Sequence, residues 1–230
     1  MRTVSGSLKQ LRLAVFDCDG TLVDSQHSII ASMHAAFDSQ HLPCPEDYAI
    51  RRTVGLPLME AVKLLHPGVA EPVIERLCNS FNMAWRNICK TTGLNEPLYD
   101  GCKVALDVLA KNGWSLGIAT GKSYNGLVGT LKQHGLLAQF STLQTADRGL
   151  GKPDPSMLFQ AMDEIGASRA DTVMIGDTTY DMEMAVNAGV LAIGVAWGYH
   201  NIRELEKAGA CMIVRTYEEL PALLQDLLAE

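Results

Sequence analysis

LAVFDCDGTLVDS, residues 13–25, joins a run of apolar side chains to two aspartates and a Gly-Thr turn. A short apolar run that ends at turn residues is typical of a strand buried on both faces, as in a parallel sheet. Asp17 and Asp19 stand two positions apart, and each carboxylate raises the cost of ionising the other. On an extended segment they would point to opposite faces, so the chain must turn at Cys18 to Gly20 for both to serve one ligand.

Five further apolar runs follow, and helix-like stretches separate them. The stretches 123–134, 154–165 and 180–188 carry apolar residues at helical spacing, with Gly or Pro at their edges. Strands that alternate with helices predict an α/β fold with a doubly wound parallel sheet. The predicted strands are 12–16, 114–119, 140–143, 172–175, 191–195 and 211–214.

The alternation stops between about residues 26 and 98, where no convincing strand occurs. Helical spacing instead covers 28–39, 58–65 and 72–90, with proline-containing breaks between these stretches. A helical insertion between the first and second strands is the simplest explanation. The expected domains are an α/β core, residues 1–24 and 99–230, and an inserted helical domain, residues 25–98.

The composition of the 230 residues is that of an ordinary globular protein, with 47% hydrophobic and 20% charged residues. The net charge is −7, and no basic run is present to follow a nucleic-acid backbone. The first apolar run is short and broken by Arg12, which fits neither a signal peptide nor a transit peptide. The longest uncharged stretch, 184–202, is interrupted by Asn187 and several glycines, which disfavours a membrane span. Six scattered cysteines without a Cys-x-x-Cys pair favour reduced thiols over a zinc site. We expect a cytoplasmic protein, a monomer or weak homodimer, without nucleic-acid or membrane partners.

Four short polar stretches follow predicted strands or precede a predicted helix. In a parallel sheet the carboxyl ends of the strands meet at one edge, where open α/β folds bind ligands. Taken singly, these residues have simpler explanations: Asp19 suits a turn, and Thr120 suits a helix N-cap. Asp177 and Asp181 likewise suit the first turn of a helix, and Lys152 suits a solvated surface. Together the four stretches form a specific signal: DCDGT (17–21), ATGKS (119–123), GKPDP (151–155) and IGDTTYD (175–181).

In this order the stretches resemble the motifs of the haloacid dehalogenase superfamily, specifically its phosphatases with a helical cap inserted after the first motif. The resemblance covers essentially the whole chain, and GVAWGYH at residues 194–200 is similar to phosphoglycolate phosphatases. It implies a Rossmann-like core with residues 25–98 as the cap. The resemblance further implies that Asp17 is the nucleophile and Asp19 the general acid and base. It implies that Thr120 and Lys152 bind the phosphoryl group. The magnesium site would then include Asp177, Asp181 and the backbone carbonyl of Asp19.

The chemistry of phosphate esters favours the same roles. An anionic phosphate monoester repels a carboxylate nucleophile, so attack by Asp17 requires a cation that screens both groups. Mg²⁺ prefers hard oxygen ligands, and Asp17 and Asp177 are the expected direct ones. Attack would give an aspartyl-phosphate, after which Asp19 would move the protons. Backbone N–H groups around Gly121 begin a helix and favour the phosphate anion. The sequence thus predicts a Mg²⁺-dependent phosphomonoester hydrolase that acts on a small phosphorylated metabolite.

Other functions agree with single features of the sequence. GIATGKS (117–123) is similar to a nucleotide-binding P-loop, but Leu116 stands where that loop needs glycine. Dehalogenases and phosphonate hydrolases of the resembled superfamily lack an acid at the position of Asp19, which favours phosphoryl transfer. A β-phosphoglucomutase-like phosphosugar mutase shares the core residues and stays an alternative, as does a catalytically silent binding protein with this fold.

Substrate choice is expected to lie in the inserted domain. Arg51, Arg52 and Gly55 belong to a basic turn ahead of Pro57, and its cations would suit a substrate carboxylate or phosphate. A solvated basic turn is the alternative interpretation. The chain departs from the resembled pattern at Thr120-Gly121, where Thr-Asn or Ser-Asn is expected, so one side chain near the phosphate is missing.

Overall fold

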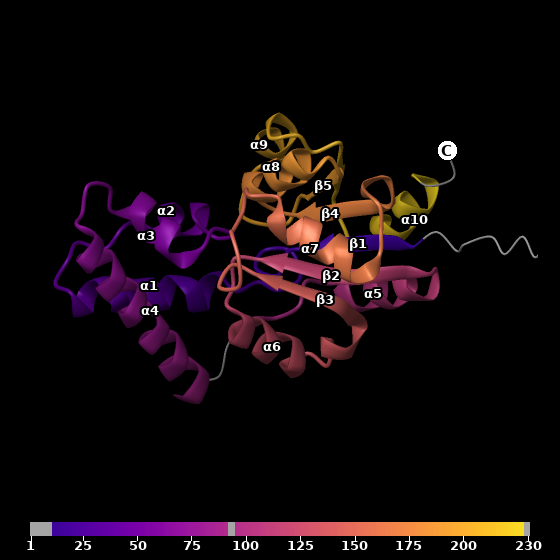
Figure 1. The fold of residues 1–230 in the computed structure, drawn as a ribbon. Coiled ribbons are helices and arrows are strands. Elements are labelled where there is room, and N and C mark those ends of the chain that lie inside the picture. Colours follow the sequence, from indigo (N-terminus) through magenta and orange to yellow (C-terminus); the bar gives the residue numbers. More distant parts are fainter. Residues whose placement is uncertain (1–10, 92–94, 228–230) are drawn as a thin grey trace, which may run out of the picture.

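The computed structural model describes residues 11–91 and 95–227, which form an α/β core with a helical insertion at one end (Figure 1). The six predicted strands are present and form one parallel sheet in the order β3-β2-β1-β4-β5-β6. The doubly wound sheet predicted from the sequence is therefore confirmed. The strands are β1 (Arg12–Phe16), β2 (Trp114–Thr120), β3 (Phe140–Thr145), β4 (Thr172–Gly176), β5 (Leu191–Val195) and β6 (Met212–Val214).

Helices cover both faces of the sheet, because successive residues of each strand point to opposite sides. In β1, Ala14 and Phe16 pack into one hydrophobic cluster and Leu13 and Val15 into another, and all four are fully buried. This burial on both faces explains the continuous apolar run in the sequence. The first cluster includes residues of α5 (Cys102–Lys111), α6 (Tyr124–Gln133) and α10 (Glu219–Asp226); the second includes residues of α7 (Ser156–Ile165), α8 (Thr179–Ala188) and α9 (Ile202–Lys207). Two short 3-10 helices are η1 (Leu137–Gln139) and η2 (Arg169–Asp171).

Between β1 and α5 the chain forms four helices that pack on one another (Figure 1). They are α1 (Gln26–Ser39), α2 (Asp47–Arg52), α3 (Leu58–Leu65) and α4 (Glu71–Thr91). Their shared core includes Phe37, Ile50 and Leu77, each fully buried. Residues 1–10 of the expected core and 92–94 of the expected insertion lie outside the described residues. None of the helices in the described part of the chain is both long and apolar enough to cross a membrane.

Helix α2 is the one element of the insertion that the sequence does not predict. It has only six residues, which is too short to display a helical repeat of apolar positions. Arg51 and Arg52, expected in a flexible turn, form the last two residues of this helix instead. The turn itself begins at Thr53, the C-cap, and leads to Pro57 at the N-cap of α3.

The two chain connections between the insertion and the core run side by side. Val23 and Leu98 form an isolated antiparallel bridge, and the N–H of Asp24 donates to the carbonyl of Pro97 at 2.9 Å. A rotation at this paired crossing would move the four helices together. The crossing is therefore a candidate hinge, and movement there stays a prediction.

The strand order brings the carboxyl ends of β1 and β4 together. Phe16 pairs with Ile175, and the N–H of Asp17 donates to the carbonyl of Ile175 at 2.9 Å. Asp17 and Asp177 therefore emerge next to each other, at the point where the strand order reverses and open α/β sheets bind ligands.

Aromatic side chains hold the turn that follows β1. The carbonyl of Thr21 accepts a hydrogen bond from the Tyr217 hydroxyl at 2.7 Å and another from the Trp197 indole at 3.1 Å. The two rings also contact each other, with centroids 4.6 Å apart. Inside the turn, Gly20 has a φ of 86°, which favours glycine, and a side chain there would collide with Asp177. The turn that carries both aspartates is thus fixed from two sides.

We expect Tyr217→Phe to lower the free energy of unfolding by about 1 kcal/mol. The substitution removes one buried hydrogen bond, while Trp197 still satisfies the carbonyl of Thr21. Urea denaturation followed by circular dichroism measures the change. Tyr48→Phe, at a position 63% exposed on α2, is the matched control and should leave the midpoint unchanged. Equal midpoints for the two variants would contradict the role given to Tyr217.

Candidate active site

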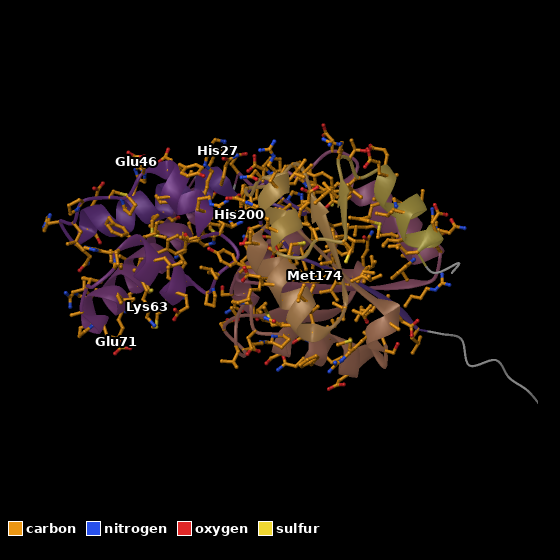
Figure 2. The ribbon with its side chains drawn as sticks, turned by 90° about the horizontal axis from the view of Figure 1, so that it is seen from above. His27, Glu46, Lys63, Glu71, Met174 and His200 are labelled. Atoms are coloured by element: carbon orange, nitrogen blue, oxygen red, sulfur yellow. The ribbon has the colours of Figure 1, made fainter. Side chains whose placement is uncertain are left out.

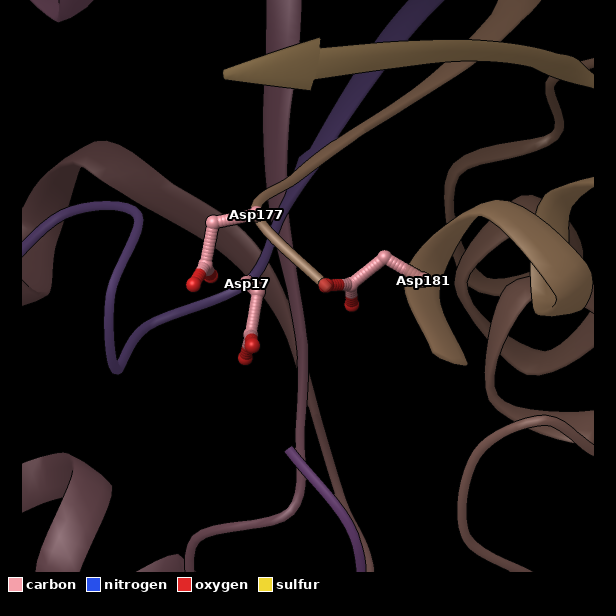
Figure 3. A group of neighbouring side chains, drawn as sticks. All are labelled: Asp17, Asp177 and Asp181. Carbon is pink, nitrogen blue, oxygen red and sulfur yellow. The ribbon is translucent and has the colours of Figure 1, made fainter. Parts of the chain in front are cut away.

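Three buried aspartates meet at the edge of the sheet described above. Asp17 follows β1, Asp177 follows β4 and Asp181 lies in the first turn of α8 (Figure 3). One oxygen of each lies within 4.8 Å of the others, and all three residues are 0% exposed. Carboxylates this close, away from water, repel one another unless cations lie among them.

Each of the two later aspartates is held by neighbouring donors. Asp177 accepts the Thr21 hydroxyl at 2.9 Å on one oxygen and the N–H of Tyr199 at 2.9 Å on the other. Asp181 accepts the N–H and the hydroxyl of Thr178 on Oδ2, at 3.0 and 2.7 Å. This is a helix-capping contact, and it leaves Oδ1 facing the other carboxylates. Asp181 therefore caps its helix and belongs to the cluster at the same time.

Lys152 supplies the positive charge inside the cluster. Its Nζ lies 2.9 Å from Asp17 Oδ2 and 2.5 Å from Asp181 Oδ1, and all three side chains are fully buried. Lys152 is therefore the cationic partner of both carboxylate oxygens. One ammonium group thus contacts two of the three carboxylates, so the cluster would be negative if all three were ionised.

The pKa values of the cluster reflect this imbalance. Burial raises the pKa of Asp17 to about 7; the Lys152 ammonium opposes this rise and the Asp181 carboxylate adds to it. Burial, followed by the charges of Asp181 and Asp17, raises the pKa of Asp177 well above its usual range. Burial alone would lower the pKa of Lys152, but its two carboxylate partners outweigh burial and raise it. A divalent cation among the aspartates would favour their ionised forms.

Thr120 and Gly121 lie at the end of β2, on the opposite side of β1 from Asp177. Thr120 is fully buried, and its hydroxyl accepts the N–H of Lys122 at 3.3 Å. Gly121 lies directly beneath the insertion: a Cβ atom there would come 2.6 Å from the carbonyl oxygen of Gly55 and 2.7 Å from that of Leu56. This close approach gives a physical reason for the departure seen in the sequence, because an Asn side chain would not fit under that backbone.

A second glycine of the core, Gly151, lies close to the same segment of the insertion, residues 55–57. A side chain at Gly151, next to Lys152, would collide with the Pro57 ring. Gly55 in turn lies against Thr178, with 3.2 Å between its ideal Cβ position and the Thr178 hydroxyl oxygen. Residues 55–57, which we call the closing segment, therefore contact three of the four core loops that the sequence singled out.

Arg51 and Arg52 do not line the cavity that adjoins this site. Arg52 forms an ion pair with Glu204 of α9 at 2.7 Å, and Arg51 donates to Gln26 at 3.4 Å. The carbonyl of Arg52 also contacts His200 Nε2 at 3.2 Å. This placement supports a role in docking the insertion on the core and gives no support to a contact with substrate. Of the three residues predicted for specificity, only Gly55 lines the cavity.

His200 lies where the insertion meets the core (Figure 2). The N–H of Thr179 donates to its Nδ1 at 3.0 Å, so Nε2 carries the hydrogen that is donated to the Arg52 carbonyl. Burial lowers the pKa of His200, which favours this neutral form. The sequence offers no signal for this contact, because residues 52 and 200 are distant along the chain.

Lys122 is the site residue that the sequence analysis leaves without a role. Its Nζ lies 2.7 Å from Asp19 Oδ1 and 2.8 Å from Glu96 Oε1, and 4.8 Å above the ring of Trp85 on α4. Glu96 is itself fixed by the Thr130 hydroxyl at 2.7 Å. Burial opposes the charge on Lys122, but the carboxylates of Asp19 and Glu96 outweigh burial and raise its pKa. Asp19 thus has a fixed cationic partner, and Glu96 lies on the chain connection that returns from the insertion.

A cavity of about 280 Å³ opens between the insertion and the core. Asp19, Gly121 and Lys122 line it on the core side, and the closing segment lines it on the other. Asp17, Thr120 and Lys152 lie deeper, fully or almost fully buried. Asp17, Asp177, Asp181 and Lys152 thus form one cluster, and the cavity is the space beside Asp19, two residues along the chain from Asp17.

Comparison with known proteins agrees with the motifs. The family model described as haloacid dehalogenase-like hydrolase matches residues 14–195. Probable phosphatase IndB of Dickeya dadantii is 34% identical over 220 residues, 94% of this chain and 94% of that protein. Pyrophosphatase PpaX of Bacillus velezensis is 31% identical, with 82% and 85% covered, and a phosphoglycolate phosphatase of Agrobacterium fabrum is 27% identical, with 95% and 94% covered. A solved hydrolase from Pseudomonas syringae is 26% identical with a TM-score of 0.80, covering 94% of this chain and 98% of that one.

We expect Gly121→Ala to weaken the contact between the closing segment and the core, because the added methyl group would meet two backbone carbonyls. Amide hydrogen exchange of residues 53–58 should become about tenfold faster, which corresponds to about 1.4 kcal/mol. Gly129→Ala on α6 is the matched control, since a side chain at that position meets nothing within 4 Å. An unchanged exchange rate in Gly121→Ala would show that the segment does not depend on this contact.

Proposed function

The chain belongs to the haloacid dehalogenase-like hydrolase family, and we propose that it is a Mg²⁺-dependent phosphomonoester hydrolase with Asp17 as its nucleophile. Its relatives are named as phosphatases, and the chain is accordingly a phosphatase. The names of those relatives refer to different substrates. The substrate class, the metal and the mechanism of this chain are therefore what we propose. The observation that supports it best is the fully buried Asp17, which contacts Lys152 and adjoins two further aspartates.

Asp17 is placed to attack a phosphoryl group. Its Oδ1 accepts the N–H of Cys18 at 2.6 Å, whereas Oδ2 contacts the Lys152 ammonium at 2.9 Å. A phosphoryl group beside Oδ2 would also meet the Lys152 ammonium and the Thr120 hydroxyl. These two groups would stabilise the negative charge of the transferring group, which is the main requirement of phosphoryl transfer.

Asp19 would carry the protons of the two steps. In the first, a bond forms between Asp17 Oδ2 and phosphorus, the ester P–O bond breaks, and the Asp19 carboxyl group gives its proton to the leaving oxygen. In the second, a water oxygen attacks phosphorus, Asp19 takes a proton from that water, and the bond to Asp17 breaks with release of inorganic phosphate. Asp19 lines the cavity, so leaving group and water would reach it from the same side.

The aspartates fit a magnesium ion. The cluster offers one hard carboxylate oxygen from each of three buried aspartates, all within 4.8 Å of one another, and the raised pKa values of Asp17 and Asp177 are what a nearby cation would reverse. The side chains of Asp17 and Asp177 and the backbone carbonyl of Asp19 would hold the ion, with Asp181 beside it. When bound, Mg²⁺ would supply the positive charge that screens the nucleophile from the anionic ester.

The insertion would act as a cap that closes over the substrate. Residues 25–98 would move about the paired crossing at Val23 and Leu98, and the closing segment would seal the site from water. The cytoplasmic location and the monomeric or weakly dimeric state stay predictions from the sequence.

We expect the purified protein to release phosphate from p-nitrophenyl phosphate with Mg²⁺ and to stop when EDTA is added. Asp17→Asn should lower kcat by about 10³-fold or more, because an amide cannot form the covalent intermediate. Asp163→Asn, at an exposed position on α7, is the matched control and should keep normal turnover. Normal turnover in Asp17→Asn would move the nucleophile elsewhere. Isomerisation of a phosphosugar without net phosphate release would favour the mutase, and ester binding without hydrolysis would favour the silent protein.

We expect Mg²⁺ to raise Tm more at pH 8 than at pH 5. The pKa of Asp17 is about 7 in the folded chain against 3.8 as the ordinary value, so between these pH values the folded state binds more protons than the unfolded state. Stability in EDTA should therefore fall as pH rises through this window, and Mg²⁺ should restore it where Asp17 is ionised. Differential scanning fluorimetry measures the shifts. Equal Mg²⁺ shifts at the two pH values, or none, would contradict a site built on these carboxylates.

A further inference from the structure

The side of the cavity that the insertion forms is largely apolar. Ile29 and Met33 of α1, Leu58 of α3, and Phe81 and Trp85 of α4 line it. The rings of Phe81 and Trp85 stack, with centroids 6.0 Å apart and planes 19° from parallel. Because the leaving group of a phosphate ester would lie on the Asp19 side of the phosphorus, it would extend toward these side chains.

The charges around the cavity disfavour an anionic leaving group. Among the described residues that line it, Lys122 is the only cationic one, and its ammonium is already shared by Asp19 and Glu96. Asp147 lines the cavity as well and adds a further negative charge. A carboxylate or second phosphate on the substrate would lose water, meet carboxylates and find no free cation.

Arg51 and Arg52, which directly precede the cavity-lining residue Thr53 in the sequence, do not change this balance. Arg52 is paired with Glu204, Arg51 contacts Gln26, and neither lines the cavity. Recognition of a substrate carboxylate usually relies on an arginine with a free guanidinium face, which this cavity lacks within the described residues.

We propose that this phosphatase selects phosphomonoesters whose leaving group is uncharged and apolar, with about the size of one aromatic ring. This inference rests on the proposed function, because it assigns the cavity to the leaving group of that reaction. Burial of a ring between Met33, Leu58 and Phe81 would supply the binding energy, while Asp19 protonates the departing oxygen.

The test compares phosphate monoesters whose leaving alcohols differ in charge and in apolar size. With excess MgCl₂, kcat/KM is measured for benzyl phosphate, 4-carboxybenzyl phosphate, methyl phosphate and phosphoglycolate. We expect benzyl phosphate to exceed each of the others by about tenfold or more. Hydrolysis that favours 4-carboxybenzyl phosphate or phosphoglycolate would overturn the inference and leave the proposed function intact. Failure to hydrolyse any of the four esters, or p-nitrophenyl phosphate, would instead overturn the proposed function.

Two variants on α4 connect the preference to the cavity. Phe81→Ala should lower the ratio of benzyl to methyl phosphate by about fivefold or more, whereas Met83→Ala, 71% exposed on the same helix, should leave it unchanged. Asn82→Arg, at an exposed position that borders the cavity, should raise the ratio of 4-carboxybenzyl to benzyl phosphate by about tenfold. An unchanged ratio in a folded Phe81→Ala would overturn the inference. If Phe81→Ala does not fold, an unchanged ratio in Asn82→Arg would do so.

Discussion

Three carboxylates lie together inside the protein, one ammonium group contacts two of them, and much of the core is arranged around this charge balance. A buried ion costs several kcal/mol unless partners compensate for the lost water, roughly the whole net stability of many domains. Lys152 offsets part of that cost, and donors on three other loops hold the remaining oxygens of Asp17, Asp177 and Asp181. The repulsion among these carboxylates destabilises the folded state at the place where the proposed reaction would need a cation. Packing and hydrogen bonds elsewhere in the fold must compensate for that cost.

The backbone around the cluster leaves no room for substitution at its closest points. Side chains at Gly20 and at Gly198 would both collide with Asp177, although the two glycines lie in different loops. The parallel pairing of β1 with β4 fixes the distance between the loops, and the Thr21 carbonyl is held by Trp197 and Tyr217. Sheet register, turn geometry and electrostatics therefore lead to the same arrangement of oxygens.

The sequence predicts most of the core, because each of its signals is local. Apolar runs identify β1 to β6, and the turn residues after them identify Asp17, Asp19 and Asp177 together with Thr120 and Lys152. The sequence is less informative about features that depend on contacts between distant segments. The pairing of Lys122 with Glu96, the docking of Arg52 on Glu204 and the apolar wall at Phe81 each join segments that are far apart in the chain. Arg51 and Arg52 suggest an anion site because the sequence shows their charges. The sequence does not show which distant side chains pair with them in the fold.

The glycines under the closing segment separate the docking of the insertion on the core from the recognition of the bound molecule, two tasks that many binding sites assign to the same side chains. Gly121 lies against the backbone of the closing segment, and Gly151 lies against its proline ring. The contact between the insertion and the core at these glycines therefore does not involve the side chains of α4 that line the cavity. Exchanges at Phe81 or Trp85 could change which molecules are accepted without altering how the units come together. The contact between the two units therefore requires glycine at two positions and leaves the cavity wall free to diverge, so new specificities could evolve while this contact stays unchanged.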